Sequence, residues 1–143
     1  MPCINFPIDP AIGPVVDIGI AQPTSLAIQG SPPPAIRWLK AIADTGCTTT
    51  SIHTDVAKAL SLPVISQAAV QSTTQTVVVN VYLVDLFIRV PFGPTAFEWP
   101  FKDRPVMELL HASATHDALL GMDMLGMGMF NVNGLIRAAT FCW

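Results

Sequence analysis

The residues best suited to chemistry lie in the segment AIADTGCTTT, residues 41–50. Asp44 ends an apolar run and is followed directly by Thr45 and Gly46. Keeping a charged carboxylate in apolar surroundings is costly, so its position there needs a reason. Asp44 is either a turn residue that bonds its own backbone two positions on, or a carboxylate that exchanges protons with a substrate. Taken alone, Asp-Thr-Gly favours the turn.

The other reactive side chains carry weaker signals. Cys47 and His53 are close in sequence, but no third residue is identified that would orient a general base, so a cysteine hydrolase is not favoured. Cys47 is interpreted as a small buried hydrophobe, with oxidation of a thiol beside the site as the alternative. The histidines at 53, 111 and 116 lack metal-ligand spacing, and we predict neither a metal nor a cofactor.

Strands dominate the elements that must position these residues. The expected strands span residues 15–21, 36–43, 106–112, 118–121 and 135–143, with a hairpin over 64–90 and helices over 54–62 and 123–129. Thr54 is expected to cap the first helix. Residues 91–101 are expected to form a loop and an edge segment, where Trp99 and Phe101 either pack at the edge or line a substrate pocket. The pattern predicts a mainly β chain with one domain over 1–143.

The composition argues against several functional classes. Only 12% of the 143 residues are charged and 51% are apolar, so we expect a subunit interface to cover the surplus apolar surface. A net charge of −3 without a basic cluster argues against nucleic-acid binding, and the apolar runs are too short for a bilayer. The N-terminal segment does not resemble a secretory signal. Cys3, Cys47 and Cys142 are odd in number and scattered, which predicts no disulfide framework, no zinc site and a cytoplasmic location.

Two motifs together resemble a known family. Asp-Thr-Gly after an apolar strand, followed much later by Leu119-Leu120-Gly121-Met122-Asp123, is similar to the single-domain, retroviral-type (retropepsin-like) aspartic proteases. A helix ending in ALSLP, a hairpin and a long apolar strand lie between the motifs, and the resemblance runs from about residue 15 to residue 143. The sequence looks most like the bacterial members and the protease domain of DNA-damage-inducible ubiquitin-shuttle proteins. The resemblance implies closed, barrel-like sheets with one or two short helices.

The resemblance also changes the interpretation of Asp44 from a turn residue to a catalytic one. In this family two carboxylates hold one water and share a proton, because two like charges about 3 Å apart cannot both ionise. That pairing is a known property of aspartic proteases and is not inferred from this sequence. Since the chain has one Asp-Thr-Gly, the resemblance implies a homodimer with two Asp44 residues facing each other across a two-fold axis. A peptide or protein would be the substrate. Asp123 is expected to act at a helix N-terminus instead.

The neighbours of Asp44 receive supporting roles from the same resemblance. Thr45 is expected to hydrogen-bond across the two-fold axis. Gly46 is expected to permit a tight turn and to donate its backbone N–H to the carboxylate. Gly121 would let the strand containing Leu119 and Leu120 pass close behind the loop.

The expected hairpin over residues 64–90 motivates a second hypothesis. Its expected tip, which would cover the substrate, consists of Gln71, Ser72, Thr73 and Thr74. This tip has no glycine, unlike that of many family members. The alternative function is therefore a catalytically silent module of the same fold for peptide binding or assembly. The terminal strand over 135–143 is expected to join the two subunits.

Overall fold

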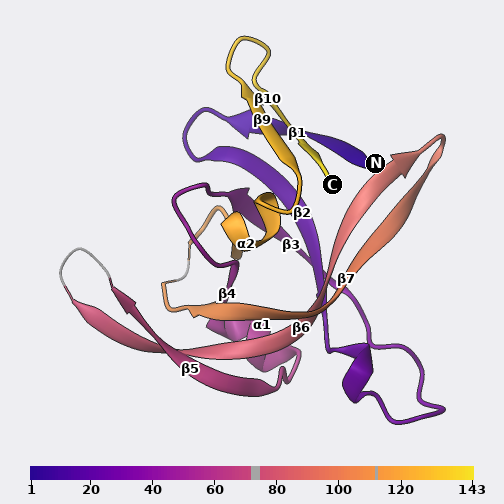
Figure 1. The fold of residues 1–143 in the computed structure, drawn as a ribbon, viewed down its shortest axis with the longest axis vertical. Coiled ribbons are helices and arrows are strands. Elements are labelled where there is room, and N and C mark those ends of the chain that lie inside the picture. Colours follow the sequence, from indigo (N-terminus) through magenta and orange to yellow (C-terminus); the bar gives the residue numbers. More distant parts are fainter. Residues whose placement is uncertain (72–74, 112) are drawn as a thin grey trace.

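The computed structural model describes residues 1–71, 75–111 and 113–143, most of which lie in strands (Figure 1). The strands are β1 (Cys3–Asp9), β2 (Gly13–Ala21), β3 (Arg37–Ala43), β4 (Ser51–His53), β5 (Val64–Gln71), β6 (Thr76–Phe92), β7 (Thr95–Leu109), β8 (Ala118–Leu120), β9 (Met129–Asn133) and β10 (Ala138–Cys142). The helices are α1 (Thr54–Ala59) and α2 (Met122–Leu125), with a 3-10 turn η1 (Thr24–Leu26). The predicted mainly β class is confirmed.

Six strands close into a barrel. Hydrogen-bonded neighbours follow the order β6-β7-β4-β8-β3-β2, and a further pairing between β2 and β6 closes the ring. The pairs β3–β8 and β4–β7 are parallel. Fully buried aliphatic side chains from β2, β6 and β8 belong to the hydrophobic core: Ile18, Ile20, Val84, Leu86, Ile88 and Leu120. Burial of this apolar surface is the main stabilising term of the fold.

Strand β6 is the long apolar arm that the sequence predicted to be buried on both faces. This prediction holds only in the middle of the strand, where Val84, Asp85 and Leu86 are all fully buried. Toward the hairpin that β6 forms with β5, Val78 is 62% exposed. The buried Asp85 carboxylate accepts hydrogen bonds from the N–H and hydroxyl of Thr24 (3.0 and 2.8 Å) and from the N–H of Asp103 (3.0 Å). These donors offset the cost of burying its polar atoms.

Residues 91–101, expected to be a loop and an edge segment, instead turn tightly between two paired strands. Phe92 pairs with Thr95, and Gly93 adopts a φ of +58° that favours glycine. Residues 106–109 of the expected strand over 106–112 belong to β7, whereas Leu110 and His111 follow its end and Ala112 lies outside the described residues. The rings of Trp99 and Phe101 lie 6.3 and 5.6 Å from that of Trp143, so both residues pack in an aromatic cluster.

The C-terminal region differs most from the prediction. The expected helix over 123–129 is the single short turn α2, and the unpredicted strand β9 begins at Met129. Strand β10 pairs with β1 on one side and with β9 on the other. Cys3 and Cys142 face each other across the β1–β10 ladder and form a disulfide, so the prediction of unpaired cysteines is wrong. Because of this disulfide, the cysteine content no longer argues for a reducing compartment.

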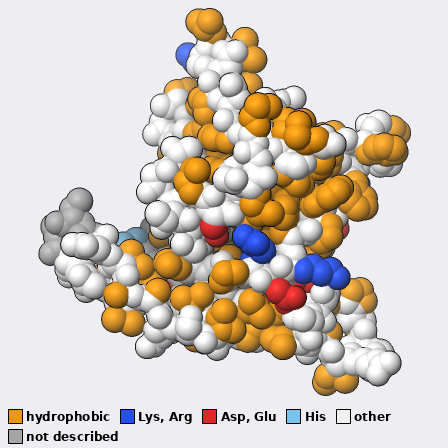
Figure 2. Space-filling model, in the orientation of Figure 1, with side chains coloured by type: hydrophobic (Ala, Val, Ile, Leu, Met, Phe, Trp, Pro, Cys, Tyr) orange, Lys and Arg blue, Asp and Glu red, His pale blue; other side chains and the backbone are white. Residues whose placement is uncertain are grey.

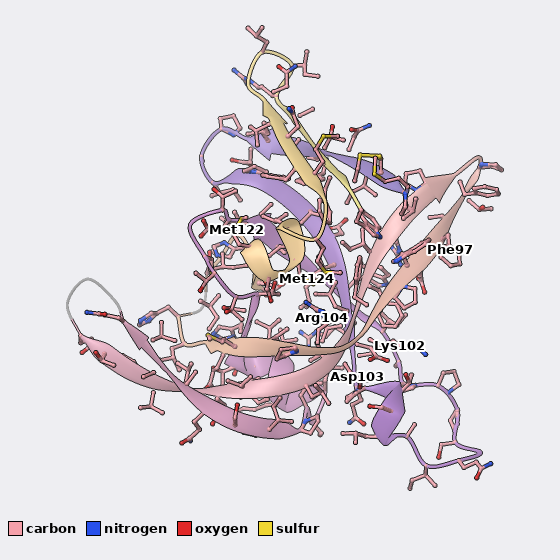
Figure 3. All side chains as sticks on the ribbon, viewed as in Figure 1. Phe97, Lys102, Asp103, Arg104, Met122 and Met124 are labelled. Atoms are coloured by element: carbon pink, nitrogen blue, oxygen red, sulfur yellow. A yellow bond between two sulfur atoms is a disulfide. The ribbon has the colours of Figure 1, made fainter. Side chains whose placement is uncertain are left out.

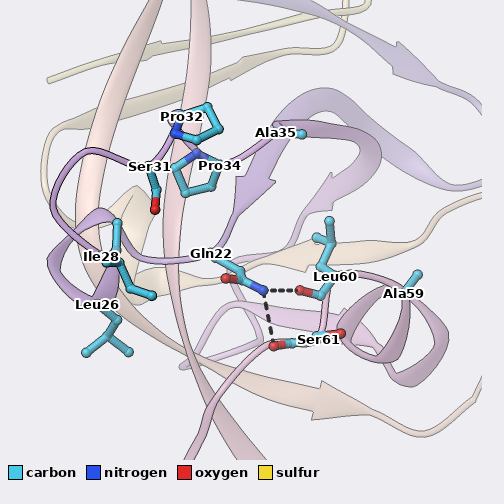
Figure 4. A pocket seen from close by; sticks show the side chains of 11 residues that line it. Gln22, Leu26, Ile28, Ser31, Pro32, Pro34, Ala35, Ala59, Leu60 and Ser61 are labelled. Atoms are coloured by element: carbon cyan, nitrogen blue, oxygen red, sulfur yellow. Dashed lines mark hydrogen bonds between the residues drawn. The ribbon is translucent and has the colours of Figure 1, made fainter.

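The helix α1 begins at Thr54 as predicted, but a different residue caps it. Its N-cap is His53, whose Nδ1 accepts from the N–H of Asp55 at 3.3 Å, whereas the Thr54 hydroxyl donates to Glu108. A hollow of about 580 Å³ lies between the end of this helix and the proline-rich loop after η1 (Figure 4). Gln22 donates there to the carbonyl oxygens of Leu60 (2.8 Å) and Ser61 (3.4 Å). In the described part of the chain, no helix is both long and apolar enough to cross a bilayer.

Apolar side chains cover much of the molecular surface. On the face shown in Figure 2 they outnumber the charged side chains, most of which lie in the lower middle of the view, with one basic side chain at the top. Figure 3 shows Arg104 of β7 just below α2, where its Nη2 donates to the carbonyl oxygen of Asp123 at 3.4 Å. Many of the exposed apolar side chains belong to β9 and the turn after it: Met129 (59% exposed), Val132 (53%), Leu135 (97%) and Ile136 (71%).

Candidate active site

Asp44 is the first residue after β3, at the start of the loop that leads to β4. Its backbone N–H donates to the carbonyl oxygen of Leu120 at 3.0 Å, which ties it to the neighbouring strand β8. The Asp44 side chain accepts at Oδ1 from the N–H of Gly46 at 2.8 Å. Both the turn interpretation and the catalytic interpretation require this bond. Asp44 is half-buried, while Thr45 and Gly46 are exposed.

The loop after Asp44 lies directly against the segment that follows β8. The N–H of Met122 donates to the carbonyl oxygen of Cys47 at 2.8 Å, and the N–H of Asp123 to that of Thr48 at 3.1 Å. A Cβ atom on Gly121 would lie 2.6 Å from the carbonyl carbon of Thr49. Only glycine therefore permits this approach of the two backbones without a shift.

A buried polar network below the loop was not predicted from the sequence. Thr50 is fully buried, and both its N–H (2.9 Å) and its hydroxyl (2.8 Å) donate to Oδ1 of Asp123. The same hydroxyl oxygen accepts from the N–H of Gly121 at 3.1 Å. Asp123 therefore lies in the first turn of α2 as expected, but its carboxylate binds the loop and does not cap the helix. The only sequence signal was the place of Thr50 within the hydroxyl run after Asp-Thr-Gly.

Leu119 lines two hollows beside the Asp44 loop. The first, of about 510 Å³, contains Asp44 and Thr45 together with Phe130 and Val132 of β9. The second, of about 430 Å³, lies between the loop after Gly46 and the β5–β6 hairpin. Its walls are the loop residues Cys47, Thr48, Thr49 and Ser51, hairpin residues including Val70, Gln71, Val77 and Val79, and β7 residues such as Met107 and Leu109.

The sequence profile of the family described as aspartyl protease matches residues 28–124 of this chain. The matched range includes the Asp44 loop, the hairpin and the Gly121 segment. The chain belongs to the aspartyl protease family. No functionally curated protein matches the sequence significantly.

A solved structure places this aspartyl protease family member in the retropepsin-like fold. It is similar to a retropepsin-like aspartic protease from Rickettsia conorii, with a TM-score of 0.58 and 13% sequence identity over 97% of this chain and 89% of that one. The retroviral protease-like domain of Ddi1 from Leishmania major also matches, with a TM-score of 0.41 and 12% identity over 89% of this chain and 87% of that domain. The similarity to the Rickettsia conorii protease confirms the expected retropepsin-like fold.

In this aspartyl protease fold, the residues predicted from the sequence lie in different surroundings. Leu120 is fully buried in the core, whereas Leu119 is only half-buried and reaches both hollows. Gln71 lines the hollow under the hairpin, while the other expected tip residues (Ser72, Thr73 and Thr74) lie outside the described residues. Cys47 is half-buried with a free thiol that donates to the carbonyl oxygen of Thr49 at 3.0 Å. Across residues 1–71, 75–111 and 113–143, His, Cys, Asp and Glu side chains form no group of metal-binding type.

Proposed function

We propose that the chain is a homodimeric aspartic endopeptidase whose site combines Asp44 with Asp44 of the partner subunit. The observation that carries the proposal is the placement of Asp44. Its carboxylate is oriented by the N–H of Gly46 and lines one hollow, and Leu119 lines both this hollow and the groove under the β5–β6 hairpin. The family membership supports a peptidase function, and a single Asp-Thr-Gly per chain makes each subunit half of a site.

The chemistry needs one proton shared between the two carboxylates. The ionised carboxylate accepts a proton from the bound water as the water oxygen attacks the carbonyl carbon of the scissile bond. The protonated carboxyl group donates a hydrogen bond and then its proton to the carbonyl oxygen, which gives a tetrahedral gem-diol. The carboxyl group that took the proton of the water then donates it to the amide nitrogen as the C–N bond breaks. The other carboxylate takes a proton from one gem-diol hydroxyl, which releases an amine and a carboxylic acid and restores the shared proton.

The strand that joins the two subunits is proposed to be β9, not the C-terminal strand expected from the family. Strand β10 has β1 on one side and β9 on the other, so neither of its edges is open to a partner. Strand β9 ends the order of the described strands. Its sequence, MFNVN, lacks the charges and prolines with which proteins usually protect a sheet edge. Because Phe130 and Val132 share a hollow with Asp44, a two-fold axis beside β9 would bring two Asp44 side chains together.

The groove also suggests the class of substrate. Apart from the loop hydroxyl groups and the polar side chains of Gln71, Glu108 and His111, the groove is lined mainly by aliphatic side chains, from Val70, Val77, Val79, Leu109 and Leu119 among others. Burial of an apolar substrate side chain there would contribute roughly 1.5–3 kcal/mol for each side chain that is fully covered. We therefore propose peptides with apolar residues next to the cleaved bond.

Asp44→Asn is the decisive variant. We expect it to keep its fold, measured by circular dichroism, and to lose cleavage of peptides that the wild type cuts, because an amide cannot accept the proton of the water. Asp17→Asn, an exposed change on β2, is the matched control and should retain activity. Cleavage that persists in Asp44→Asn rules out the proposal.

A peptide mimic with a hydroxyl group in place of the scissile carbonyl separates catalysis from mere peptide binding. Tight binding that requires Asp44 supports an enzyme, because such a mimic resembles the tetrahedral intermediate. Equal binding to the wild type and to Asp44→Asn supports a catalytically silent binding module.

A further inference from the structure

Glu108 lies where the β5–β6 hairpin leaves the barrel, and its carboxylate accepts hydrogen bonds from three residues that belong to two segments. Oε2 accepts from the backbone N–H of Asn80 at 3.0 Å. Oε1 accepts from the hydroxyl of Thr54 at 3.0 Å and from that of Tyr82 at 3.3 Å. One side chain of β7 therefore connects the start of α1 with the part of β6 that continues into the hairpin.

The strand register explains why a side chain is needed at this point. The β6–β7 ladder ends with the pair Val81 and Met107. From Met107 onward β7 pairs with β4 instead, where Glu108 lies opposite Ile52. The N–H of Asn80 thus has no ladder partner on β7, and the Glu108 carboxylate supplies the missing acceptor at the fork between the two strands.

The hairpin beyond this fork forms one wall of the substrate groove. Val77 and Val79 of β6 line it opposite Thr48 and Thr49 of the Asp44 loop. Because Val77 and Val79 lie on β6 beyond Asn80, their position depends on the direction in which β6 leaves the barrel there. A change in that direction would move Val77 and Val79 and so change the width of the groove.

A carboxylate suits this position better than a neutral group. Hydrogen bonds to an ionised acceptor are roughly twice as strong as those between neutral groups, and a carboxylate has lone pairs for all three donors. Burial raises the pKa of the Tyr82 hydroxyl above its usual value, and Glu108 adds to this effect, so the hydroxyl remains a donor. Tyr82 itself is buried, which protects the bond from water.

We propose that Glu108 is a positioning residue that sets how closely the β5–β6 hairpin covers the groove, and thereby how tightly substrate binds. The proposal rests on the proposed function, because it assigns the groove to a peptide substrate. Glu108 does not touch the reacting atoms. Its loss is expected to act on binding and not on the proton transfers at Asp44.

Glu108→Gln tests the proposal with little change in shape. The amide keeps one acceptor oxygen but replaces the other with an NH₂ group, which cannot accept from Asn80 or from the hydroxyls. We expect KM for a peptide that spans the groove to rise about tenfold while kcat changes less than twofold. Glu98→Gln on the same strand is the matched control, because Glu98 is exposed and pairs only with Arg89 at 3.7 Å among the described ion pairs. An unchanged KM in an active Glu108→Gln enzyme overturns the proposal.

Amide hydrogen exchange tests the same idea without any need for cleavage. We expect faster exchange at Asn80 and along β5 and the outer half of β6 in Glu108→Gln, with unchanged exchange in β2 and β3. Uniformly faster exchange would indicate a general loss of stability and would overturn a positioning role. A wild type that cuts no peptide refutes the proposed function, yet the exchange pattern still decides the role of Glu108.

A second variant covers the case in which Glu108→Gln folds poorly. Tyr82→Phe removes one donor and leaves the carboxylate in place. We expect a smaller rise in KM, about two- to threefold, with the same direction of change in hairpin exchange. Hairpin exchange equal to that of the wild type in Tyr82→Phe contradicts the proposal.

Discussion

Thr50 and Asp123 are joined by two hydrogen bonds, because both the N–H and the hydroxyl of Thr50 donate to Oδ1 of Asp123 at 2.9 and 2.8 Å. The pair connects the loop that begins at Asp44 to the segment that follows β8. A threonine and an aspartate that are far apart in the sequence thus fix the candidate catalytic loop to the segment after β8.

Thr50→Val is expected to lower the free energy of unfolding by about 1–3 kcal/mol. The change keeps the size of the side chain but removes the hydroxyl, which leaves the N–H of Gly121 without its acceptor in the interior. Urea unfolding measures the loss. Thr48→Val, at an exposed position of the same loop, is the control and should change stability by less than about 0.5 kcal/mol. Equal effects of the two variants would contradict a special role for Thr50.

Tyr82 should make stability fall at alkaline pH. Its pKa is raised in the folded state by burial and by Glu108, above the ordinary value of 10.0. The unfolded chain therefore loses the phenolic proton first, and as pH rises above 10 the unfolded state binds fewer protons than the folded state. The contribution of Tyr82 to stability is fully present below that pH and is lost as pH rises through the folded pKa.

Comparison with Tyr82→Phe isolates this effect from the titration of other groups. The wild type should lose more stability than the variant between neutral and strongly alkaline pH, measured by unfolding in denaturant. Tyr82 is the single tyrosine of the chain, so its ultraviolet absorbance reports its ionisation directly. An absorbance titration with a midpoint at or below the ordinary tyrosine pKa would contradict the prediction.

The Cys3–Cys142 disulfide should contribute about 2–5 kcal/mol to stability, because it closes almost the whole chain with a sequence separation of 139. We expect Cys3→Ser to unfold at a lower temperature, and a reducing agent to lower the unfolding temperature of the wild type to the same value. Cys47→Ser, which leaves the disulfide intact, should respond to the reducing agent as the wild type does. A wild type that is insensitive to reduction would contradict this prediction.

Val132→Lys tests the proposed subunit interface at β9. Val132 is 53% exposed in the single chain, so a lysine there should leave the subunit folded. In the proposed dimer the added charge would be brought close to its own symmetry mate, and we expect monomers by analytical ultracentrifugation with loss of cleavage. Ile28→Lys, at a position 79% exposed in the proline-rich loop, is the matched control and should stay dimeric. A Val132→Lys variant that remains dimeric would show that the subunit interface does not lie at β9.

The local sequence pattern by itself was enough to predict many of the strands and the helix α1. The apolar runs that form β2, β3 and β8 are short and bounded by turn residues, so the positions of these strands can be predicted from the sequence. The same holds for α1, which begins at Thr54 as expected. The placement of Asp-Thr-Gly directly after a strand, and of a glycine directly after Leu119 and Leu120, was also readable. These features depend on neighbours within a few residues, which the sequence displays.

Only the tertiary structure decided the contacts between segments that are distant in the chain. The Thr50–Asp123 bonds, the Cys3–Cys142 disulfide and the Glu108 fork each join residues whose proximity follows from the sheet order and not from local pattern. Strand β9 was missed because its short polar and apolar mixture resembles a loop until β10 supplies a pairing partner. Local chemistry thus determined which residue could act, whereas strand pairing determined what holds that residue in place.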